Sequence, residues 1–312
     1  MKKNLLNPLY TETPLVTASA AALPEDATAW LKLEYFQPSG SFKLRGISHA
    51  CQRFYQQGAQ GFACASGGNA GLAVAYTGKK LGVPVTIVVP ESTTQKAITA
   101  IENQGAQLLV RGSNYNQAYQ YARQQLAPNQ VYIHSYDHPL LWEGHASLVD
   151  EIKAAGVVPD LVILSVGGGG LLCGVIEGLI RNGWATVPVL AVETEGAHSL
   201  AASLGAKKHV ALSQIESIAT SLGAVKVASK AYEYAQKHSV FSHVLSDRTA
   251  VAACLQFVQT HNQLVEPACG AALATLSEGH PILVGKKNIV VVVCGGVGSD
   301  IDQLNHWQKT LP

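Results

Sequence analysis

Short apolar runs alternate along the chain with segments in which apolar residues recur at helical spacing. The runs typical of strands cover residues 30–34, 61–65, 85–89, 107–110, 131–133, 161–165, 189–193 and 288–293. Helical patterns follow several of them, as in the segments that end at Leu81 before Gly82 and at Asn103 before Gly105. Strands joined by helices form parallel sheets covered on both faces, so the pattern predicts an α/β fold.

A second series of strands follows a helical pattern over residues 142–155. This order predicts two α/β layers with an active-site crevice between them, and boundaries near residues 40 and 140. The first 25 residues contain Pro8, Pro14 and Pro24, so they are expected to form an arm on the surface that returns to the second layer.

Lys43 follows a loop that reads Pro-Ser-Gly-Ser-Phe over residues 38–42. The apolar residues Leu44, Ile47, Cys51 and Phe54 then recur at the spacing of one helical face, which places Lys43 in the first turn of a helix. The positive end of the helix dipole disfavours an ammonium there and helps to lower its pKa, which suits an amine that attacks a carbonyl. The alternative is a solvated surface lysine.

Four consecutive glycines, residues 167–170, follow a buried strand and precede a helix. Backbone N–H groups at such a turn, together with the helix dipole, favour a bound phosphate, although a tight turn without a ligand is the alternative. A dinucleotide fingerprint fails because Leu172 or Cys173 stands where its third glycine belongs. Glu193 does stand where a ribose-binding acid would, so the dinucleotide hypothesis is weakened and stays open.

The loop Ser-Gly-Gly-Asn-Ala-Gly, residues 66–71, also joins a strand to a helix. It offers a hydroxyl, an amide and free N–H groups to a substrate carboxylate, or it is an ordinary helix cap. His134 and His138 stand four residues apart, but loop residues surround them and no carboxylate pair accompanies them, so a metal site has little support. A lysine together with a phosphate cradle is what pyridoxal phosphate requires.

Composition narrows the possible partners. The formal net charge is +1 and 14% of residues are charged, with no basic stripe, so no nucleic-acid partner is expected. The longest apolar run, residues 289–294, is too short to cross a membrane, and no signal-peptide core follows Lys2 and Lys3. Six dispersed cysteines without a CxxC motif indicate reduced thiols, so a cytoplasmic protein is expected.

Several stretches resemble the fold type II pyridoxal-phosphate enzymes, and within them the liver-type L-serine dehydratase/L-threonine deaminase family. The resemblance rests on Pro-Ser-Gly-Ser-Phe-Lys at 38–43, the loop at 66–71 and Ser-Val-Gly-Gly-Gly-Gly-Leu-Leu-Cys-Gly at 165–174. Further similar stretches lie at 141–147, 193–199, 265–272 and 293–296. The likeness runs from about residue 13 to residue 300.

The resemblance implies a two-domain fold like that of the tryptophan synthase β subunit, with parallel sheets covered by helices and the active site between the domains. Residues 1–40 and 140–312 would form the large, cofactor-binding domain and residues 41–139 the small domain. A homodimer is expected from the family alone.

The resemblance also implies roles for individual residues. Lys43 would form the Schiff base and remove the α-proton, Phe42 would stack on the pyridine ring, Asn69 would bind the 3′-oxygen, and the thiol of Cys294 would face the ring nitrogen. The residues expected to hold the phosphate are Gly167, Gly168, Gly169, Gly170 and Leu171. Those expected to hold the substrate carboxylate are Ser66, Gly67, Gly68, Asn69 and Ala70.

Glu193, Ala197 and Ser199, with a carbonyl near Leu222, resemble the family's monovalent-cation site, for which potassium is expected; an ordinary loop is the alternative. The implied activity is an ammonia-lyase of amino-acid catabolism that converts L-serine to pyruvate and L-threonine to 2-oxobutanoate. The alternatives are another type II reaction, serine racemisation or β-replacement, and a catalytically silent amino-acid-binding protein.

The chain departs from the family pattern in two places. Several relatives have alanine where this chain has Gly67, so the missing methyl is expected to enlarge the space beside the substrate. Residues 297–299 read Val-Gly-Ser where relatives have Ser-Asn, so the surroundings of the ring nitrogen are expected to differ. No regulatory domain of the biosynthetic threonine deaminases follows, so feedback by isoleucine is not expected.

Overall fold

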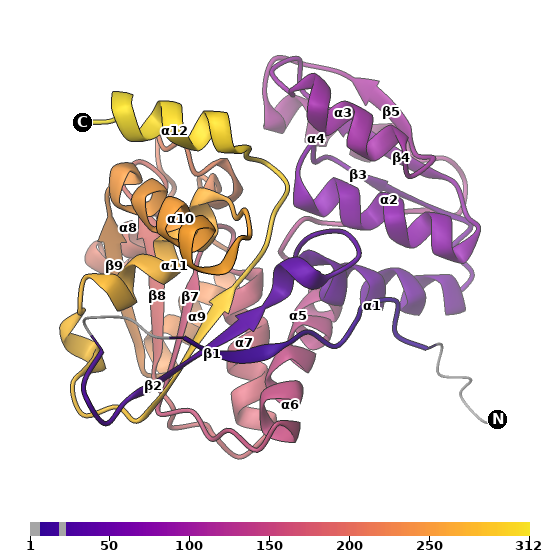
Figure 1. Cartoon of the computed structure of the whole chain (residues 1–312). Coiled ribbons are helices and arrows are strands. Elements are labelled where there is room, and N and C mark those ends of the chain that lie inside the picture. Colours follow the sequence, from indigo (N-terminus) through magenta and orange to yellow (C-terminus); the bar gives the residue numbers. More distant parts are fainter. Residues whose placement is uncertain (1–6, 19–22) are drawn as a thin grey trace.

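The computed structural model describes residues 7–18 and 23–312, which form two α/β units (Figure 1). The larger unit contains a six-stranded sheet in the order β1-β2-β10-β7-β8-β9. Its strands are β1 (Leu15–Ala18), β2 (Thr28–Leu33), β7 (Leu161–Ser165), β8 (Val189–Thr194), β9 (Val240–Leu245) and β10 (Asn288–Val293). All neighbouring strands run parallel except β1 and β2, which pair antiparallel.

The smaller unit contains a four-stranded parallel sheet in the order β5-β4-β3-β6 (Figure 1). Its strands are β3 (Gly61–Cys64), β4 (Val85–Val89), β5 (Gln107–Val110) and β6 (Gln130–Tyr132). The helices of this part of the chain are α1 (Lys43–Gln56), α2 (Asn69–Leu81), α3 (Gln95–Glu102) and α4 (Tyr115–Gln124). As predicted, α2 ends where Gly82 adopts a left-handed conformation with φ +68°.

The remaining helices cover the larger sheet. They are α5 (Pro139–His145), α6 (Ser147–Ala154), α7 (Gly170–Arg181), α8 (Ser199–Gly205), α9 (Ser229–Lys237), α10 (Asp247–His261), α11 (Pro267–Ser277) and α12 (Ile301–Thr310). Three short 3-10 helices are η1 (Glu34–Phe36), η2 (Thr220–Leu222) and η3 (Pro281–Leu283). Strand β7 is wholly buried and β10 almost wholly, as their uninterrupted apolar runs predict. No helix in the described ranges is both long and apolar enough to cross a membrane.

The predicted α/β fold is confirmed, and three of its elements differ from the prediction. Residues 15–18 return to the larger unit, as predicted for the N-terminal arm, but they form a regular edge strand, β1, on β2. Another edge strand, β9, is not predicted by the sequence pattern, because its exposed Phe241 breaks the usual buried run. The helix expected over 142–155 is two helices, because the hydroxyl of Ser147 donates to the carbonyl of Gly144 at 2.8 Å and interrupts the helical ladder. The exact domain boundaries near residues 40 and 140 stay predictions.

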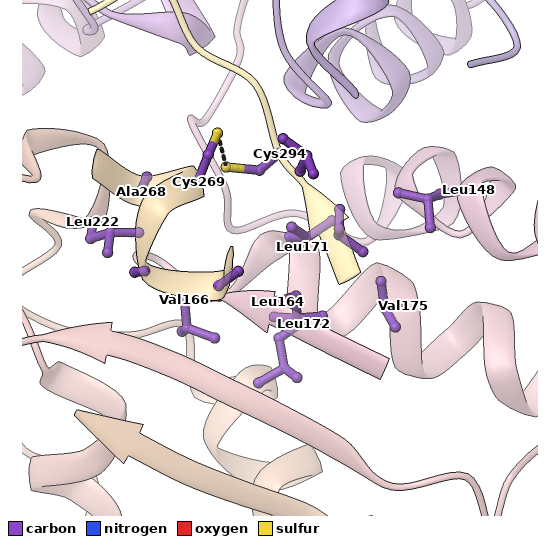
Figure 2. Close-up of a cluster of buried hydrophobic side chains, with 14 of the residues drawn as sticks. Leu148, Leu164, Val166, Leu171, Leu172, Val175, Leu222, Ala268, Cys269 and Cys294 are labelled. Atoms are coloured by element: carbon purple, nitrogen blue, oxygen red, sulfur yellow. Dashed lines mark hydrogen bonds between the residues drawn. The ribbon is translucent and has the colours of Figure 1, made fainter. Parts of the chain in front are cut away.

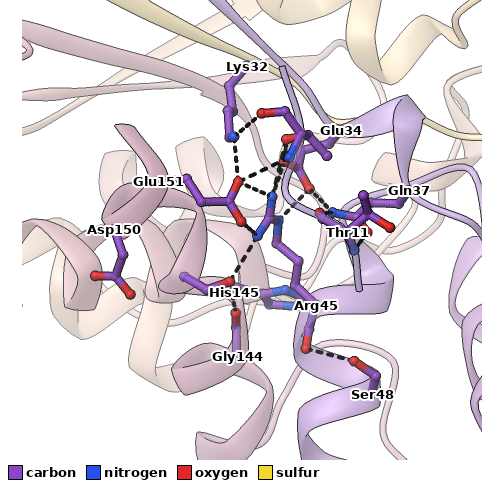
Figure 3. Close-up of polar contacts among 12 residues, drawn as sticks. Thr11, Lys32, Glu34, Gln37, Arg45, Ser48, Gly144, His145, Asp150 and Glu151 are labelled. Atoms are coloured by element: carbon purple, nitrogen blue, oxygen red, sulfur yellow. Dashed lines mark hydrogen bonds and ion pairs between the residues drawn. The ribbon is translucent and has the colours of Figure 1, made fainter. Parts of the chain in front are cut away.

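A buried cluster of charges joins α1 to the larger unit (Figure 3). Arg45 donates from Nε to Glu34 at 2.6 Å, and both side chains have 0% exposure. Its other nitrogens reach Glu151 on α6, which also pairs with Lys32 of β2. Burial would raise the pKa of Glu151, but its bonds with Arg45 and Lys32 lower that pKa below its usual range. Two cations and two anions therefore balance inside the protein.

The Nζ of Lys32 also donates to the carbonyl of Thr13 at 2.6 Å, and the hydroxyl of Thr13 donates to Glu34 at 2.6 Å. The N-terminal segment before β1 is thus held by the same charges that fix the first turn of α1. Because a buried charge that loses its partner is strongly destabilising, this cluster specifies one arrangement of β2, α1 and α6.

Replacing Arg45 by methionine should lower the free energy of unfolding by about 3–5 kcal/mol, because it leaves two buried carboxylates without their main partner. Urea denaturation of both proteins measures the difference. The control is Arg181→Met, which removes an exposed pair with Asp150 and should cost about 0–1 kcal/mol. Equal losses in the two variants would contradict the role of the buried cluster.

Candidate active site

A pocket of about 430 Å³ lies where the carboxyl ends of β7 and β10 meet the starts of α1, α2 and α7. Its lining residues are Phe42, Lys43, Asn69, Ser165, Gly167, Gly168, Gly169, Gly170, Leu171, Ser221, Leu222, Glu266, Ala268, Cys294 and Gly295. Its position at the carboxyl ends of parallel strands is where α/β proteins bind ligands.

Lys43 is the first residue of α1, which confirms that it lies in the first turn of a helix. Its Nζ donates to the carbonyl of Ser135 at 2.7 Å. Burial lowers the pKa of this amine to about 8, against the opposing influence of Cys64, Cys294 and Glu266. A minor fraction of Lys43 is therefore neutral near neutral pH, larger than for an ordinary lysine, and able to act as a nucleophile or base.

Phe42 fixes the start of α1 against the end of β10. Its backbone N–H donates to the carbonyl of Cys294 at 2.9 Å, and its ring lies 4.9 Å from that of His145. The Nδ1 of His145 accepts the N–H of Gly46 at 3.2 Å, so a neutral imidazole caps the first turn. These contacts direct the Lys43 side chain into the pocket.

The glycine loop at residues 167–170 has no room for side chains. A Cβ on Gly168 would lie 2.2 Å from the ring of Tyr136, and Gly169 has φ +85°. The N–H groups of residues 167–169 have no protein acceptor among the described residues, and α7 has no side-chain cap. A backbone cradle with free donors at a helix N-terminus fits the phosphate that the sequence predicts.

Asn69 begins α2 and lines the pocket. Its Nδ2 donates to Glu266 at 3.0 Å and to Ser221 at 3.3 Å, and its Oδ1 accepts the N–H of Val297 at 3.2 Å. The other loop residues expected to hold a carboxylate, namely Ser66, Gly67, Gly68 and Ala70, do not line the pocket. Their role in substrate binding stays a prediction.

Cys294 is buried directly after β10, above a cluster of apolar side chains that includes Leu171 (Figure 2). Its sulfur lies 3.4 Å from that of Cys269 and accepts the hydroxyl of Ser165 at 3.7 Å. Burial raises the pKa of Cys269 well above its usual range, so that thiol is neutral. The predicted thiol thus faces the pocket on a rigid apolar base.

Glu266 is the main pocket residue to which the sequence analysis gave no role. It directly precedes Pro267, the first residue of α11, and is 4% exposed. Burial raises the pKa of its carboxyl, while hydrogen bonds from Ser221, Gly298 and Asn69 lower it. A Glu-Pro pair at a helix start looks like ordinary capping, so only its burial in the pocket distinguishes it. Four further lining residues had no role predicted from the sequence, namely Ser165, Ser221, Ala268 and Gly295.

Glu193, at the end of β8, is 0% exposed, and its carboxylate accepts the N–H groups of Leu200 and Ala201 at 2.8 Å each. Burial raises its pKa to about 7, and no cationic side chain within the described ranges pairs with it. The nearby hydroxyl of Ser199 is buried without a hydrogen-bond partner. A buried carboxylate near an unpartnered hydroxyl is a donor set that fits a cation.

Within residues 7–18 and 23–312, the structure does not link the other two residues of the expected cation site, Ala197 and Leu222, to Glu193 by hydrogen bonds. Ala197 is buried between β8 and α8, whereas Leu222 belongs to η2 and lines the pocket. The carbonyl of Leu222 accepts the N–H of Ala224 at 2.8 Å, and no hydrogen bond in the described part of the chain joins Leu222 to Glu193 or Ser199.

The expectation that Gly67 leaves extra space is wrong. A Cβ added to Gly67 would lie 2.6 Å from Cγ2 of Thr93, which follows β4. The space of the missing methyl is therefore filled by Thr93. The N–H groups of Val297 and Gly298 bind Asn69 and Glu266. The expected difference in the surroundings of the ring nitrogen stays a prediction.

Comparison with known proteins agrees with this geometry. The family described as "Pyridoxal-phosphate dependent enzyme" matches residues 6–295. The L-serine dehydratase/L-threonine deaminase of Homo sapiens is 45% identical, covering 97% of this chain and 96% of that protein. The L-serine dehydratase of Dictyostelium discoideum is 40% identical, and the match covers 98% of this chain and 93% of that protein.

Two solved structures superpose well on this chain. A fungal L-serine ammonia-lyase from Rhizomucor miehei has a TM-score of 0.90 at 36% identity, covering 97% of this chain and 99% of that chain. Maize serine racemase has a TM-score of 0.85 at 24% identity, covering 97% and 94%, which shows the fold alone.

Gly67→Ala should lower the free energy of unfolding by about 1 kcal/mol, because the added methyl overlaps the terminal methyl of half-buried Thr93, which must shift. Thr93→Ser removes the overlapping methyl, so the double variant should regain most of that loss relative to Thr93→Ser alone. Urea denaturation of the four proteins measures this coupling. Additive losses would show that Thr93 does not fill the space.

Proposed function

This chain belongs to the family of pyridoxal-phosphate dependent enzymes, and we propose that it is an ammonia-lyase of L-serine and L-threonine. L-serine gives pyruvate and ammonia, and L-threonine gives 2-oxobutanoate and ammonia. The observation that carries this conclusion is a buried lysine of lowered pKa that faces the same pocket as a side-chain-free phosphate cradle. The identity of 45% to a curated dehydratase/deaminase selects this reaction within the family.

The pocket fits pyridoxal phosphate. The N–H groups of residues 167–171 would hold its phosphate, the ring of Phe42 would contact its pyridine face, Asn69 would bind its 3′-oxygen and Cys294 would face its ring nitrogen. When bound, the cofactor supplies an aldehyde that an amine can attack and a ring that withdraws electrons from the α-carbon of the substrate.

Lys43 supplies the base. Its Nζ is held at 2.7 Å from the carbonyl of Ser135, and burial keeps part of it neutral, so it can accept the α-proton of a substrate amino acid. Cys294 offers a thiol in place of a carboxylate to the ring nitrogen. A weaker electron sink suits β-elimination, in which hydroxide leaves promptly, better than transamination.

The start of α2 would hold the substrate carboxylate. Gly68 is its N-cap and provides no side chain, so the first N–H groups of the helix are open to an anion. Ser66 adds a hydroxyl that currently accepts the N–H of Gly68 at 3.3 Å. These donors support the proposal that residues 66–70 bind a carboxylate.

Potassium is the proposed ion at Glu193, Ala197, Ser199 and Leu222. The buried carboxylate of Glu193 and the unpartnered hydroxyl of Ser199 support it. A monovalent ion can bind both oxygens and costs less to dehydrate than a divalent cation. We further propose a cytoplasmic homodimer. Six free, buried cysteines support a reducing compartment, and half-exposed Ile180 and Phe241 support a covered surface.

Lys43→Ala should reduce 2-oxo acid release from L-serine and L-threonine at least about a thousandfold, because it removes both the nucleophile and the base. The measurement is a steady-state assay with added pyridoxal phosphate and potassium. Lys237→Ala, at a side chain 72% exposed, is the control and should keep full activity. Oxo-acid release that survives in the Lys43 variant would overturn the assignment, and formation of D-serine without oxo acid would indicate a racemase.

Replacing potassium by tetramethylammonium should lower turnover, because the larger ion cannot enter a buried site. Glu193→Gln should weaken the apparent potassium affinity at least about tenfold. Titration of activity with potassium chloride at constant ionic strength measures both effects, with Glu195→Gln at the adjacent loop as the control. Turnover that is equal in the two cations would argue against the cation site.

A further inference from the structure

Glu266 is the one carboxylate among the described residues that line the pocket, and it joins both units of the protein. Oε1 accepts Nδ2 of Asn69, at the start of α2 in the smaller unit, at 3.0 Å. Oε2 accepts the N–H of Gly298, in the segment after β10, at 3.3 Å. A buried carboxylate between two donors from different parts of the fold is held in one place.

Two independent partners determine which way the amide of Asn69 faces. The N–H of Val297 can only donate, so the atom of Asn69 that lies 3.2 Å from it must be the carbonyl oxygen. Glu266 accepts on the other side, so the atom facing it must be the amide nitrogen. One N–H of that nitrogen is used by Glu266, and the second makes the longer bond, 3.3 Å, to the hydroxyl of Ser221, which also lines the pocket. An acceptor bound in the pocket would take the place of that hydroxyl.

The backbone at Gly296 packs directly against the carboxylate of Glu266 and restricts its position. Gly296 has φ +149°, and a Cβ on it would lie 2.0 Å from Cδ of Glu266. The segment after β10 therefore closes directly onto the carboxylate, and only glycine permits that approach. Displacement of Glu266 would also release the N–H of Gly298, which has no other acceptor in the described structure.

We propose that Glu266 is a positioning residue that orients the amide of Asn69 so that its second N–H meets the 3′-oxygen of the cofactor. This inference rests on the proposed function, because it assigns Asn69 to that oxygen. Glu266 acts through Asn69. If it were removed, only the N–H of Val297 would still hold the amide, so the N–H that faces the 3′-oxygen would be held less firmly.

A double-mutant cycle between Glu266 and Asn69 tests the inference. Glu266→Gln is nearly isosteric, but its side chain has only one acceptor oxygen for the two donors, Asn69 and Gly298. Its NH₂ group then faces the donor that the oxygen does not reach. Cofactor retention by the holoenzyme is measured by equilibrium dialysis. Glu266→Gln and Asn69→Ala should each weaken cofactor affinity about tenfold, and the double variant should bind no more weakly than Asn69→Ala alone.

The control is Glu278→Gln, the same substitution at the far end of α11, which should bind the cofactor normally. Glu266→Asp replaces the glutamine variant if the latter does not fold, and it should show the same coupling to Asn69→Ala. The inference would be overturned, and the proposed function left intact, by either of two results. One is losses of cofactor affinity that multiply in the double variant, and the other is normal cofactor affinity in the Glu266 variants. A wild-type protein that retains no cofactor would overturn the proposed function and this inference with it.

Discussion

The buried pairing of Arg45 with Glu34 and Glu151 is the interaction on which the site depends. Arg45 lies two residues after Lys43 in the same first turn of α1, so its position sets the direction in which the lysine points. Charges at 0% exposure cannot be separated without a large desolvation cost, and the cluster therefore tolerates little movement of α1 against β2 and α6. The reactive amine is positioned by electrostatics that lie outside the pocket.

The pocket depends on glycines, whose lack of side chains lets backbone segments approach closely. Glycines at 167–170 let α7 begin against Tyr136, and Gly296 lets the segment after β10 approach Glu266. The rigid apolar packing below Leu171 and Cys294 supports these loops from beneath. Donors that have no protein partner are thus held in fixed positions before any ligand arrives, which reduces the cost of ordering them on binding.

Local patterns in the sequence were sufficient to find the features that depend on neighbouring residues. Lys43 at a helix start and the glycine cradle after β7 are both readable from a few consecutive positions. The role of Glu266 could not be predicted from the sequence, because its contacts come from residues far away in the chain. The same reason explains the wrong expectation at Gly67, since only the folded chain brings Thr93 against it. The edge strands β1 and β9 carry too little apolar pattern to be predicted.

The pairing of β2 with β10 has a consequence for the order in which the chain folds. These neighbours in the larger sheet are drawn from opposite ends of the sequence, as the hydrogen bond between Trp30 and Asn288, 258 residues apart, illustrates. The smaller sheet uses only residues 61–132, so it can form on the ribosome while the larger sheet still lacks a central strand. Until β10 emerges, β2 and β7 expose unpaired edges, and the nascent chain is most exposed to aggregation during that interval.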